Sequence, residues 1–170
     1  MEFSIGDQVM HPKHGAGQIT GQKHLKIVEG FENYYVIKVG DKGLVVHIPM
    51  RKMEELGVRP IMARSKLTRV LDTLRDTPYR LSENFKIRQA RVKEKLKTGR
   101  PLEIAEVVRD LTWRKHRASL SAADARLLDR GLDLLSAEIA LVTNKEPFDV
   151  HKTISNTLTD AMENDVNGKS

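Results

Sequence analysis

The sequence predicts an α+β protein with two domains, a small antiparallel β-barrel followed by a bundle of about five α-helices. Three observations lead to this prediction. The first 50 residues hold short β-type runs between Gly-containing turns. After Pro49 the hydrophobic residues recur with a helical period. The length of 170 residues is sufficient for two small hydrophobic cores.

Four runs rich in β-branched or aromatic residues predict the strands of the barrel. They are separated by turn signals, in particular Glu29-Gly30 and Asp41-Lys42-Gly43, and the last run stops at Pro49. Short Gly-containing turns of this kind join antiparallel neighbours. The predicted strands cover residues 8–10, 18–27, 34–39 and 44–48.

Amphipathic periods and end signals predict the helices. The first helix starts at Ser65, which is placed as an N-cap, and ends at Pro78. The second covers about residues 83–97 and stops at Gly99, a residue suited to a helix C-terminus. The third has Pro101 in its first turn, where proline is tolerated.

The last two helices are predicted in the same way. Ser121 followed by Asp124 resembles a capping box for the fourth helix, and Asp149 is placed as the cap of the fifth. Residues 164–170 are expected to be frayed or disordered. The predicted organisation is a β domain over residues 1–57, a helical domain over 58–165 and a disordered tail over 166–170.

Lysine and arginine are concentrated in one segment. The chain has a formal net charge of +6, and residues 84–117 hold 11 Lys/Arg against 4 Asp/Glu, a surplus of +7 that exceeds the total. Residues 1–60 hold 8 against 7. This asymmetry predicts a polyanion-binding surface on the helical domain and a nearly neutral β domain.

The composition argues against several classes of function. The chain has no cysteine, which excludes disulfides and thiolate metal sites, and its 6 histidines are dispersed without a carboxylate cluster. No Gly-rich phosphate loop, nucleophile elbow or catalytic carboxylate pair is visible, so we expect neither enzymatic activity nor a cofactor or metal. We also expect no signal peptide, no membrane span and a cytoplasmic location.

The segment Lys86–Arg100 gives the strongest local signal for a binding surface. On a helix, Phe85, Val92 and Leu96 share one face, and most of the Lys and Arg side chains lie off that face. Exposed cations neutralise phosphates and release counterions, which favours binding without reading base sequence. The alternative is a solvated lysine-rich helix that binds nothing.

Two aromatic residues of the helical domain are candidates for DNA contact. Trp113 projects from the predicted polar face of its helix together with Arg109. An apolar side chain surrounded by cations can wedge between base steps in a minor groove. Packing against a neighbouring element is the alternative for Trp113, and periodicity alone favours a core position for Phe85.

Several segments together resemble the CarD family of bacterial transcription regulators. The opening segment Ile5–Gly17 is similar to the start of the RNA-polymerase-interacting domain that this family shares with the transcription-repair coupling factor. The helical second half of the chain excludes the coupling factor itself. Its Pro12 and its Gly-x-Gly turn match the family pattern. The other matching segments are Tyr34–Val39, Ile48-Pro49, Gly57–Arg59, Glu94–Gly99, Ala105–Leu111 and the helix that begins at Leu120-Ser121.

The resemblance implies a Tudor-like (SH3-like) barrel that docks on the RNA polymerase β subunit and a helical domain that contacts DNA at the upstream edge of the transcription bubble. In the family a tryptophan presses into the minor groove there and helps to hold the melted state. Phe85 occupies that position here, which favours an exposed wedge over a core position. The DNA-binding residues expected on this basis are Phe85, Lys86, Arg88, Arg91, Lys93, Trp113 and Arg114.

The chain departs from the family at its contact positions. Leu25 and His47 align with polymerase-contacting arginines of well-known members, and Ile87 stands where arginine is frequent. The phenylalanine wedge is smaller than tryptophan and lacks the indole N–H, which suggests a weaker or retuned activator. The polymerase contacts that we expect instead come from Lys23, Lys26, His47 and Arg51.

The function expected from the sequence is transcription regulation. The protein would bind the RNA polymerase β subunit and stabilise the promoter open complex through minor-groove and phosphate contacts. The alternative is a protein–protein adaptor on RNA polymerase whose helical domain binds an acidic protein. An RNA-binding protein is disfavoured because the barrel lacks a basic aromatic platform. We expect a monomer without a small-molecule ligand.

Overall fold

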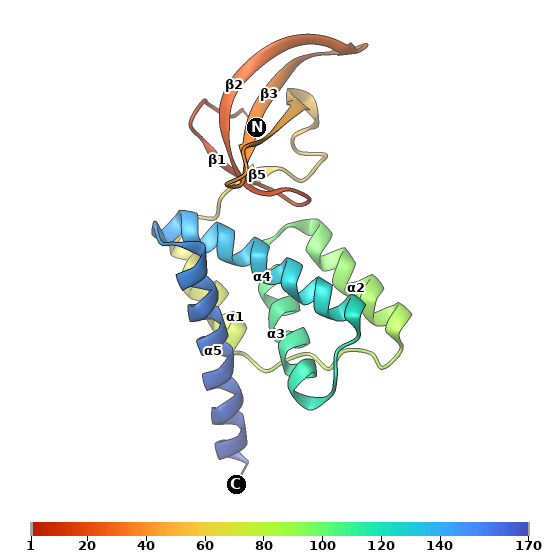
Figure 1. The fold of residues 1–170 in the computed structure, drawn as a ribbon, viewed down its shortest axis with the longest axis vertical. Coiled ribbons are helices and arrows are strands. Elements are labelled where there is room, and N and C mark those ends of the chain that lie inside the picture. The colour runs from red at the N-terminus through yellow and green to blue at the C-terminus, as the bar shows by residue number, and fades with distance from the viewer. Residues whose placement is uncertain (1, 170) are drawn as a thin grey trace. The chain divides into compact units, whose positions relative to one another are not determined.

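The computed structural model describes residues 2–169 of the chain. The chain divides into two compact units, Met1–Ile61 and Met62–Ser170 (Figure 1). The division therefore follows residue 61, whereas the sequence predicted it after residue 57. Residues 59–60 belong to the first unit because they form strand β5, which pairs with β1.

The first unit is one antiparallel sheet of five strands in the order β4-β3-β2-β1-β5. β4 and β5 form its two edges and do not pair with each other, so the predicted barrel is an open sheet. β2 and β3 form a long curved hairpin (Figure 1). The elements are β1 Gln8–His11, β2 Gly15–Val28, β3 Phe31–Val39, β4 Leu44–Pro49, the 3-10 helix η1 Met50–Lys52 and β5 Arg59–Pro60.

The core of this unit lies on one face of the sheet. Alternate residues of the strands are buried there, as expected for a sheet with one solvated face, and Met53 and Val58 from the segment after η1 cover them. Tyr35 also fixes the N-terminal segment, because its hydroxyl accepts a hydrogen bond from the Phe3 backbone N–H at 3.0 Å. The other buried residues are Val9, Ile19, Ile37, Val39 and Ile48.

The Gly-x-Gly turn noted in the sequence has two different causes. Gly15 adopts a φ of 85°, which lies in the left-handed region that favours glycine. Gly17 pairs closely with β3, and a Cβ there would lie 2.9 Å from the backbone oxygen of Lys38. The motif is therefore required by the turn conformation at Gly15 and by the close approach of β2 and β3 at Gly17.

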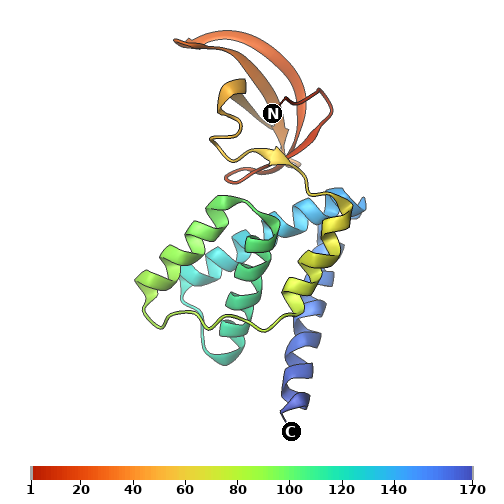
Figure 2. The same cartoon turned by 180° about the vertical axis from the view of Figure 1, so that it is seen from behind.

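The second unit contains five helices, as predicted. Helix α3 contacts each of the other four helices, and it lies between α1 and α2 with α4 running across it (Figures 1 and 2). Its buried side chains Ile104, Val107, Val108 and Leu111 form the centre of the helical core. The elements are η2 Arg64–Lys66, α1 Leu67–Arg75, α2 Phe85–Thr98, α3 Pro101–Arg117, α4 Ala122–Thr143 and α5 Pro147–Gly168.

Three of the predicted helix ends are confirmed. Gly99 ends α2 in the left-handed conformation with a φ of 67°. Pro101 begins α3. Ser121 caps α4, and its side-chain oxygen accepts a hydrogen bond from the backbone N–H of Asp124.

Three other predictions about helix ends were wrong. Ser65 lies inside the 3-10 turn η2 and does not cap α1. Asp149 lies in the first turn of α5, which begins earlier, at Pro147, because proline is well suited to a first helical position. The predicted disordered tail is helical through Gly168. Extension of a helix that is already formed costs little free energy, because each added residue also adds a backbone hydrogen bond. An ion pair of 2.8 Å between Lys169 and Asp165 supports this last turn.

Candidate nucleic-acid interface

The N-terminus of α2 presents an exposed aromatic side chain. Phe85 is the first residue of the helix and is 56% exposed. The side chain of Asn84 caps the helix by accepting hydrogen bonds from the backbone N–H groups of Lys86 and Ile87. Ile87 is also exposed. The structure therefore exposes two apolar side chains, which flank Lys86 in the sequence, in the first turn of a helix whose N-terminus is capped.

A buried ion pair fixes this end of α2 to α4. Arg88 donates from Nη2 to Oδ2 of Asp124 at 2.8 Å and from Nε to the same oxygen at 3.1 Å. Its Nη1 donates to the backbone oxygens of Ser82 and Glu83. The two charged side chains are 5% and 0% exposed. Arg88 was expected to contact phosphate, and this expectation is corrected, because its donors are used inside the protein.

The charge of Asp124 is maintained inside the helical unit. Burial opposes ionisation of its carboxyl group, but the hydrogen bonds from Arg88 and Ser121 outweigh burial and hold the pKa of Asp124 below its ordinary value. The pair is therefore an ionised one at neutral pH. It holds the start of α2 three residues from Phe85.

A second ion pair connects the segment before α2 to α3. Nη2 of Arg114 lies 3.3 Å from Oε2 of Glu83. The hydrogen bond from Arg114 lowers the pKa of Glu83 from its ordinary value. The Arg114 side chain is only 12% exposed. Arg114 was expected among the DNA-binding residues, but in the structure its guanidinium forms an ion pair with Glu83.

Trp113 does not project into solvent as its helical position predicted. Its side chain is partly buried, and its indole Nε1 is fully buried. Arg109, expected on the same exposed face, is 4% exposed and donates from Nε to Oδ1 of Asp110 at 2.8 Å. The reason is that the chain between α1 and α2 crosses this face of α3, where Asp110 accepts a hydrogen bond from the backbone N–H of Tyr79.

The exposed cations of α2 form two groups on different sides of the helix. Lys86, Lys93 and Lys97 recur at i, i+7 and i+11, so they share one face. Arg91 and Lys95 belong to the other group, which borders a cavity next to α3. Of the expected residues, Lys86 and Lys93 thus share one exposed face of α2 and Arg91 lies on another side, while Phe85 is exposed at the N-terminus of the helix.

A further group of exposed cations lies at the adjoining helix ends, and its members on α3 belong to the basic segment 84–117 noted in the sequence. Lys115 and Arg117 are exposed at the C-terminal end of α3, and Arg126 is exposed in the first turns of α4. The pairs Arg88–Asp124 and Arg114–Glu83 bring these helix ends to the start of α2. Arg126 gave no sequence signal, because it lies in a segment, residues 118–144, that has 2 Lys/Arg against 4 Asp/Glu.

The first unit presents a different kind of surface. The expected partner-binding residues Lys23, Lys26, His47 and Arg51 are all exposed. His47 lies on the edge strand β4, opposite Val36 of β3. Lys23 and Lys26 lie on β2 within the long hairpin. Exposed apolar residues accompany them on the same two elements, namely Ile27, Val28, Leu44 and Val45.

Neither a metal centre nor a membrane-spanning helix is found within residues 2–169. No group of three or more His, Cys, Asp or Glu side chains in this range is arranged to hold a metal ion. No helix in it has both the length and the apolar character needed to cross a bilayer.

Comparison with known proteins matches both units. Residues 3–62 match the model of the CarD-like/TRCF RID domain, and residues 69–155 match the model of the CarD C-terminal domain. The chain is also similar to a Bacillus subtilis (strain 168) protein described as "Putative transcription factor YdeB". The two are 31% identical over 144 residues, which cover 82% of this chain and 92% of the relative.

Proposed function

The chain belongs to the CarD family of transcription regulators, and from this premise we propose that it binds the RNA polymerase β subunit and stabilises the open promoter complex. In this proposal the first unit docks on the polymerase. The helical unit contacts DNA at the upstream edge of the bubble, with Phe85 as a wedge. The observation that carries the DNA half of the proposal is the exposure of Phe85 at a capped helix N-terminus beside Lys86.

The open edge of the first unit supports docking on a protein. β4 pairs only with β3, so one side of its backbone is free to accept another strand. The backbone oxygen of Val36 accepts a hydrogen bond from Oγ1 of Thr20 on the β2 side. This places Val36 and His47 in a non-hydrogen-bonded pair of the β3–β4 ladder. The N–H and C=O of His47 then face the open edge.

The side chains next to this edge are suited to a protein partner. Leu44 and Val45 on β4 are about half exposed, at 51% and 50%. Residues 1–60 are nearly neutral, with 8 Lys/Arg against 7 Asp/Glu, which does not favour a polyanion. In this arrangement His47 and Arg51 flank the strand contact, and Lys23 and Lys26 contribute from the hairpin.

The surface around Phe85 supports contact with opened DNA. Apolar side chains inserted from the minor groove unstack base steps, and the adjacent cations hold the phosphates. Phe85 and Ile87 supply exposed apolar area, and Lys86, Lys93 and Lys97 supply charge on one face of α2. The buried pair of Arg88 and Asp124 orients the start of this helix.

The proposed mechanism requires only weak intrinsic affinity for DNA. Binding to the polymerase raises the effective concentration of the helical unit at the promoter. Contacts made only with melted DNA then shift the equilibrium between closed and open complexes by their differential free energy. A differential of about 1.4 kcal/mol changes this equilibrium about tenfold.

The proposal is tested by the lifetime of open complexes formed with purified polymerase and a competitor-challenged promoter. Phe85→Ala should shorten the lifetime toward that of polymerase alone while binding to the polymerase is retained. Phe148→Ala is the matched control, because Phe148 is 79% exposed on α5 and lies outside the proposed surface. An unchanged lifetime with Phe85→Ala, or an equal loss with both variants, contradicts the wedge.

Salt dependence separates this proposal from the adaptor alternative. Each phosphate contact contributes a slope of about −0.9 to the logarithm of the binding constant against the logarithm of salt concentration on duplex DNA. Binding of the protein to promoter-bound polymerase should therefore weaken more steeply with salt than its binding to polymerase without DNA. Equal slopes would favour an acidic protein as the partner of the helical unit.

A further inference from the structure

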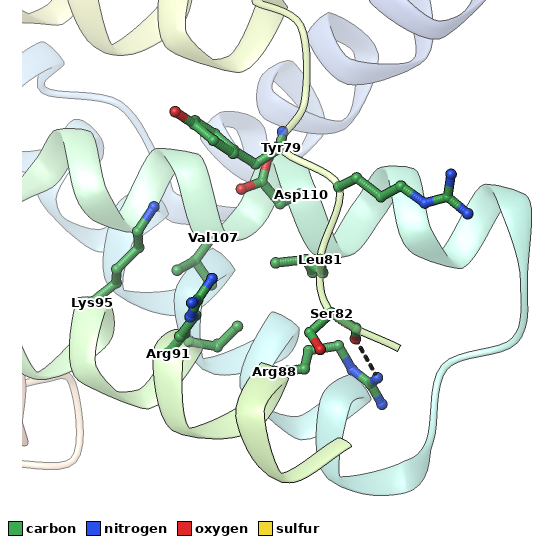
Figure 3. A pocket seen from close by; sticks show the side chains of 10 residues that line it. Tyr79, Leu81, Ser82, Arg88, Arg91, Lys95, Val107 and Asp110 are labelled. Atoms are coloured by element: carbon green, nitrogen blue, oxygen red, sulfur yellow. Dashed lines mark hydrogen bonds between the residues drawn. The ribbon is translucent and has the colours of Figure 1, made fainter. Parts of the chain in front are cut away.

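A cavity of about 190 Å³ lies between α2, α3 and the segment that connects α1 to α2. Figure 3 shows Tyr79 and Asp110 on one side of it, with Arg91 and Lys95 extending from α2 toward them. Its volume is below the roughly 300–1,000 Å³ of pockets that enclose a drug-sized ligand. It therefore has room for one ring or one small group, with the remainder of a ligand outside.

The cavity combines an exposed aromatic ring with an aliphatic floor. Tyr79 is 71% exposed. The floor consists of Leu81 from the connecting segment, Val92 from α2 and Val107 from α3. A planar ring can stack on an exposed tyrosine irrespective of its substituents, because every nucleobase has a π face.

The four cations that border the cavity, Arg80, Arg88, Arg91 and Lys95, are not equivalent. The hydrogen-bond donors of Arg88 are used by Asp124 and by the backbone oxygens of Ser82 and Glu83. Lys95 lies 2.6 Å from Oε2 of Glu106 and 5.8 Å from the centre of the Tyr79 ring. Arg91 is exposed, and its guanidinium has no hydrogen-bond or ion-pair partner within residues 2–169. The charge of Arg80 acts on Glu83, whose pKa it lowers, so Arg91 is the bordering cation that is available for an anion.

The one carboxylate of the cavity does not oppose an anion strongly. Asp110 accepts hydrogen bonds from Nε of Arg109 at 2.8 Å and from the backbone N–H of Tyr79 at 3.0 Å. Burial raises the pKa of Asp110, against the opposing hydrogen bond from Arg109. Its charge is therefore balanced by Arg109, and the cations on the α2 side of the cavity that do not contact Asp124 are Arg91 and Lys95, the latter paired with Glu106.

We propose that this cavity binds a single nucleotide unit, with the base stacked on Tyr79 and the phosphate held by Arg91 and Lys95. Such a unit can come from an unpaired residue of a melted DNA strand or from a free nucleotide. The first source rests on the proposed function, because the strand would reach the cavity along α2 from Phe85. The second source is independent of that function.

The test compares the affinity of the full chain for a short labelled DNA single strand with its affinity for the duplex of the same sequence, by fluorescence anisotropy. Tyr79→Ala and Arg91→Gln should weaken binding to the single strand about fivefold to a hundredfold, as for loss of a base–aromatic stack, and weaken binding to the duplex less. Tyr79→Phe should retain the single-strand preference because the ring remains. Lys152→Gln removes an equal charge from an exposed position on α5, outside both proposed surfaces, and should leave the ratio of the two affinities unchanged.

Deoxyadenosine monophosphate distinguishes the two sources by competition and by calorimetry. If the protein binds deoxyadenosine monophosphate and both Arg91→Gln and Tyr79→Ala abolish this binding, the ligand is a free nucleotide. If it does not bind the mononucleotide, but the two variants alter the ratio of single-strand to duplex affinity, the ligand is the DNA strand. The proposal is overturned if Tyr79→Ala has no effect on either ligand, or if Arg91→Gln and Lys152→Gln have equal effects. Failure of the proposed function is a separate result, since it is measured by the effect of Phe85→Ala on open-complex lifetime.

Discussion

Arg88 and Asp124, which are 36 residues apart in sequence, form a buried ion pair that joins α2 to α4. Nη2 of Arg88 lies 2.8 Å from Oδ2 of Asp124, and the two side chains are almost fully excluded from solvent. The pair fixes the start of α2, where Phe85 is exposed. Its role is therefore to orient the proposed DNA surface, and Arg88 itself is not part of that surface.

Removal of one partner of this pair should destabilise the helical unit. Asp124→Asn leaves the Arg88 cation buried without a counter-charge, and such a loss costs about 3–5 kcal/mol. The measurement is urea unfolding followed by circular dichroism. Asp72→Asn is the control, because Asp72 pairs with Arg75 on the surface at 3.3 Å and exposed pairs contribute less than about 1 kcal/mol. Equal unfolding midpoints for the two variants would contradict the structural role of the pair.

The stability of the protein should fall at acidic pH because of Asp124. The folded-state pKa of Asp124 is lower than its unfolded value, so ionisation stabilises the folded state above about pH 4, and this contribution is lost as the pH falls through the folded-state pKa. The raised pKa of Asp110 acts in the opposite sense, since protonation there favours the folded state as the pH falls. The free energy of unfolding of the wild type should therefore decline more steeply below about pH 4 than that of Asp124→Asn, in which the Asp110 contribution is the same. Parallel pH profiles of the two proteins would refute this assignment.

A larger aromatic wedge should prolong the open complex. Phe85→Trp enlarges the apolar side chain at an exposed position, so the fold has room for it and more area can insert between bases. We expect a longer open-complex lifetime at promoters where Phe85→Ala shortens it. Phe148→Trp serves as the control for a change in exposed aromatic area alone. A shorter lifetime with Phe85→Trp would indicate that the site is matched in shape to phenylalanine.

A proline in β4 should weaken binding to the polymerase without unfolding the first unit. Val45 pairs with Lys38 two residues from the His47–Val36 pair, so its N–H also faces the open edge. Val45→Pro removes that donor, and proline is tolerated on edge strands at such positions. Val45→Thr retains the N–H and should bind normally in a pull-down with the polymerase β subunit. Undiminished binding of a folded Val45→Pro variant would exclude strand addition at this edge.

The sequence predicted most of the elements and part of the candidate site. The α+β order, the turn at Gly30, the C-terminus of α2 at Gly99 and the cap at Ser121 all depend on residues close together in the chain. Among the predictions about the site, those that failed concern long-range contacts. Periodicity placed Arg109 and Trp113 on an exposed face of α3, but the segment around Tyr79 crosses that face.

The distinction is a physical one. Helix and strand periods, the helix ends at Gly99 and Ser121 and the cationic surplus of residues 84–117 are properties of neighbouring residues, so the sequence by itself determined them. Which of those cations reaches solvent was decided only by the tertiary structure. Burial and ion pairing arise from side chains that are distant in sequence, as when Asp124 neutralises Arg88 and Glu83 neutralises Arg114, while Arg91 and Lys93 on the same helix stay exposed.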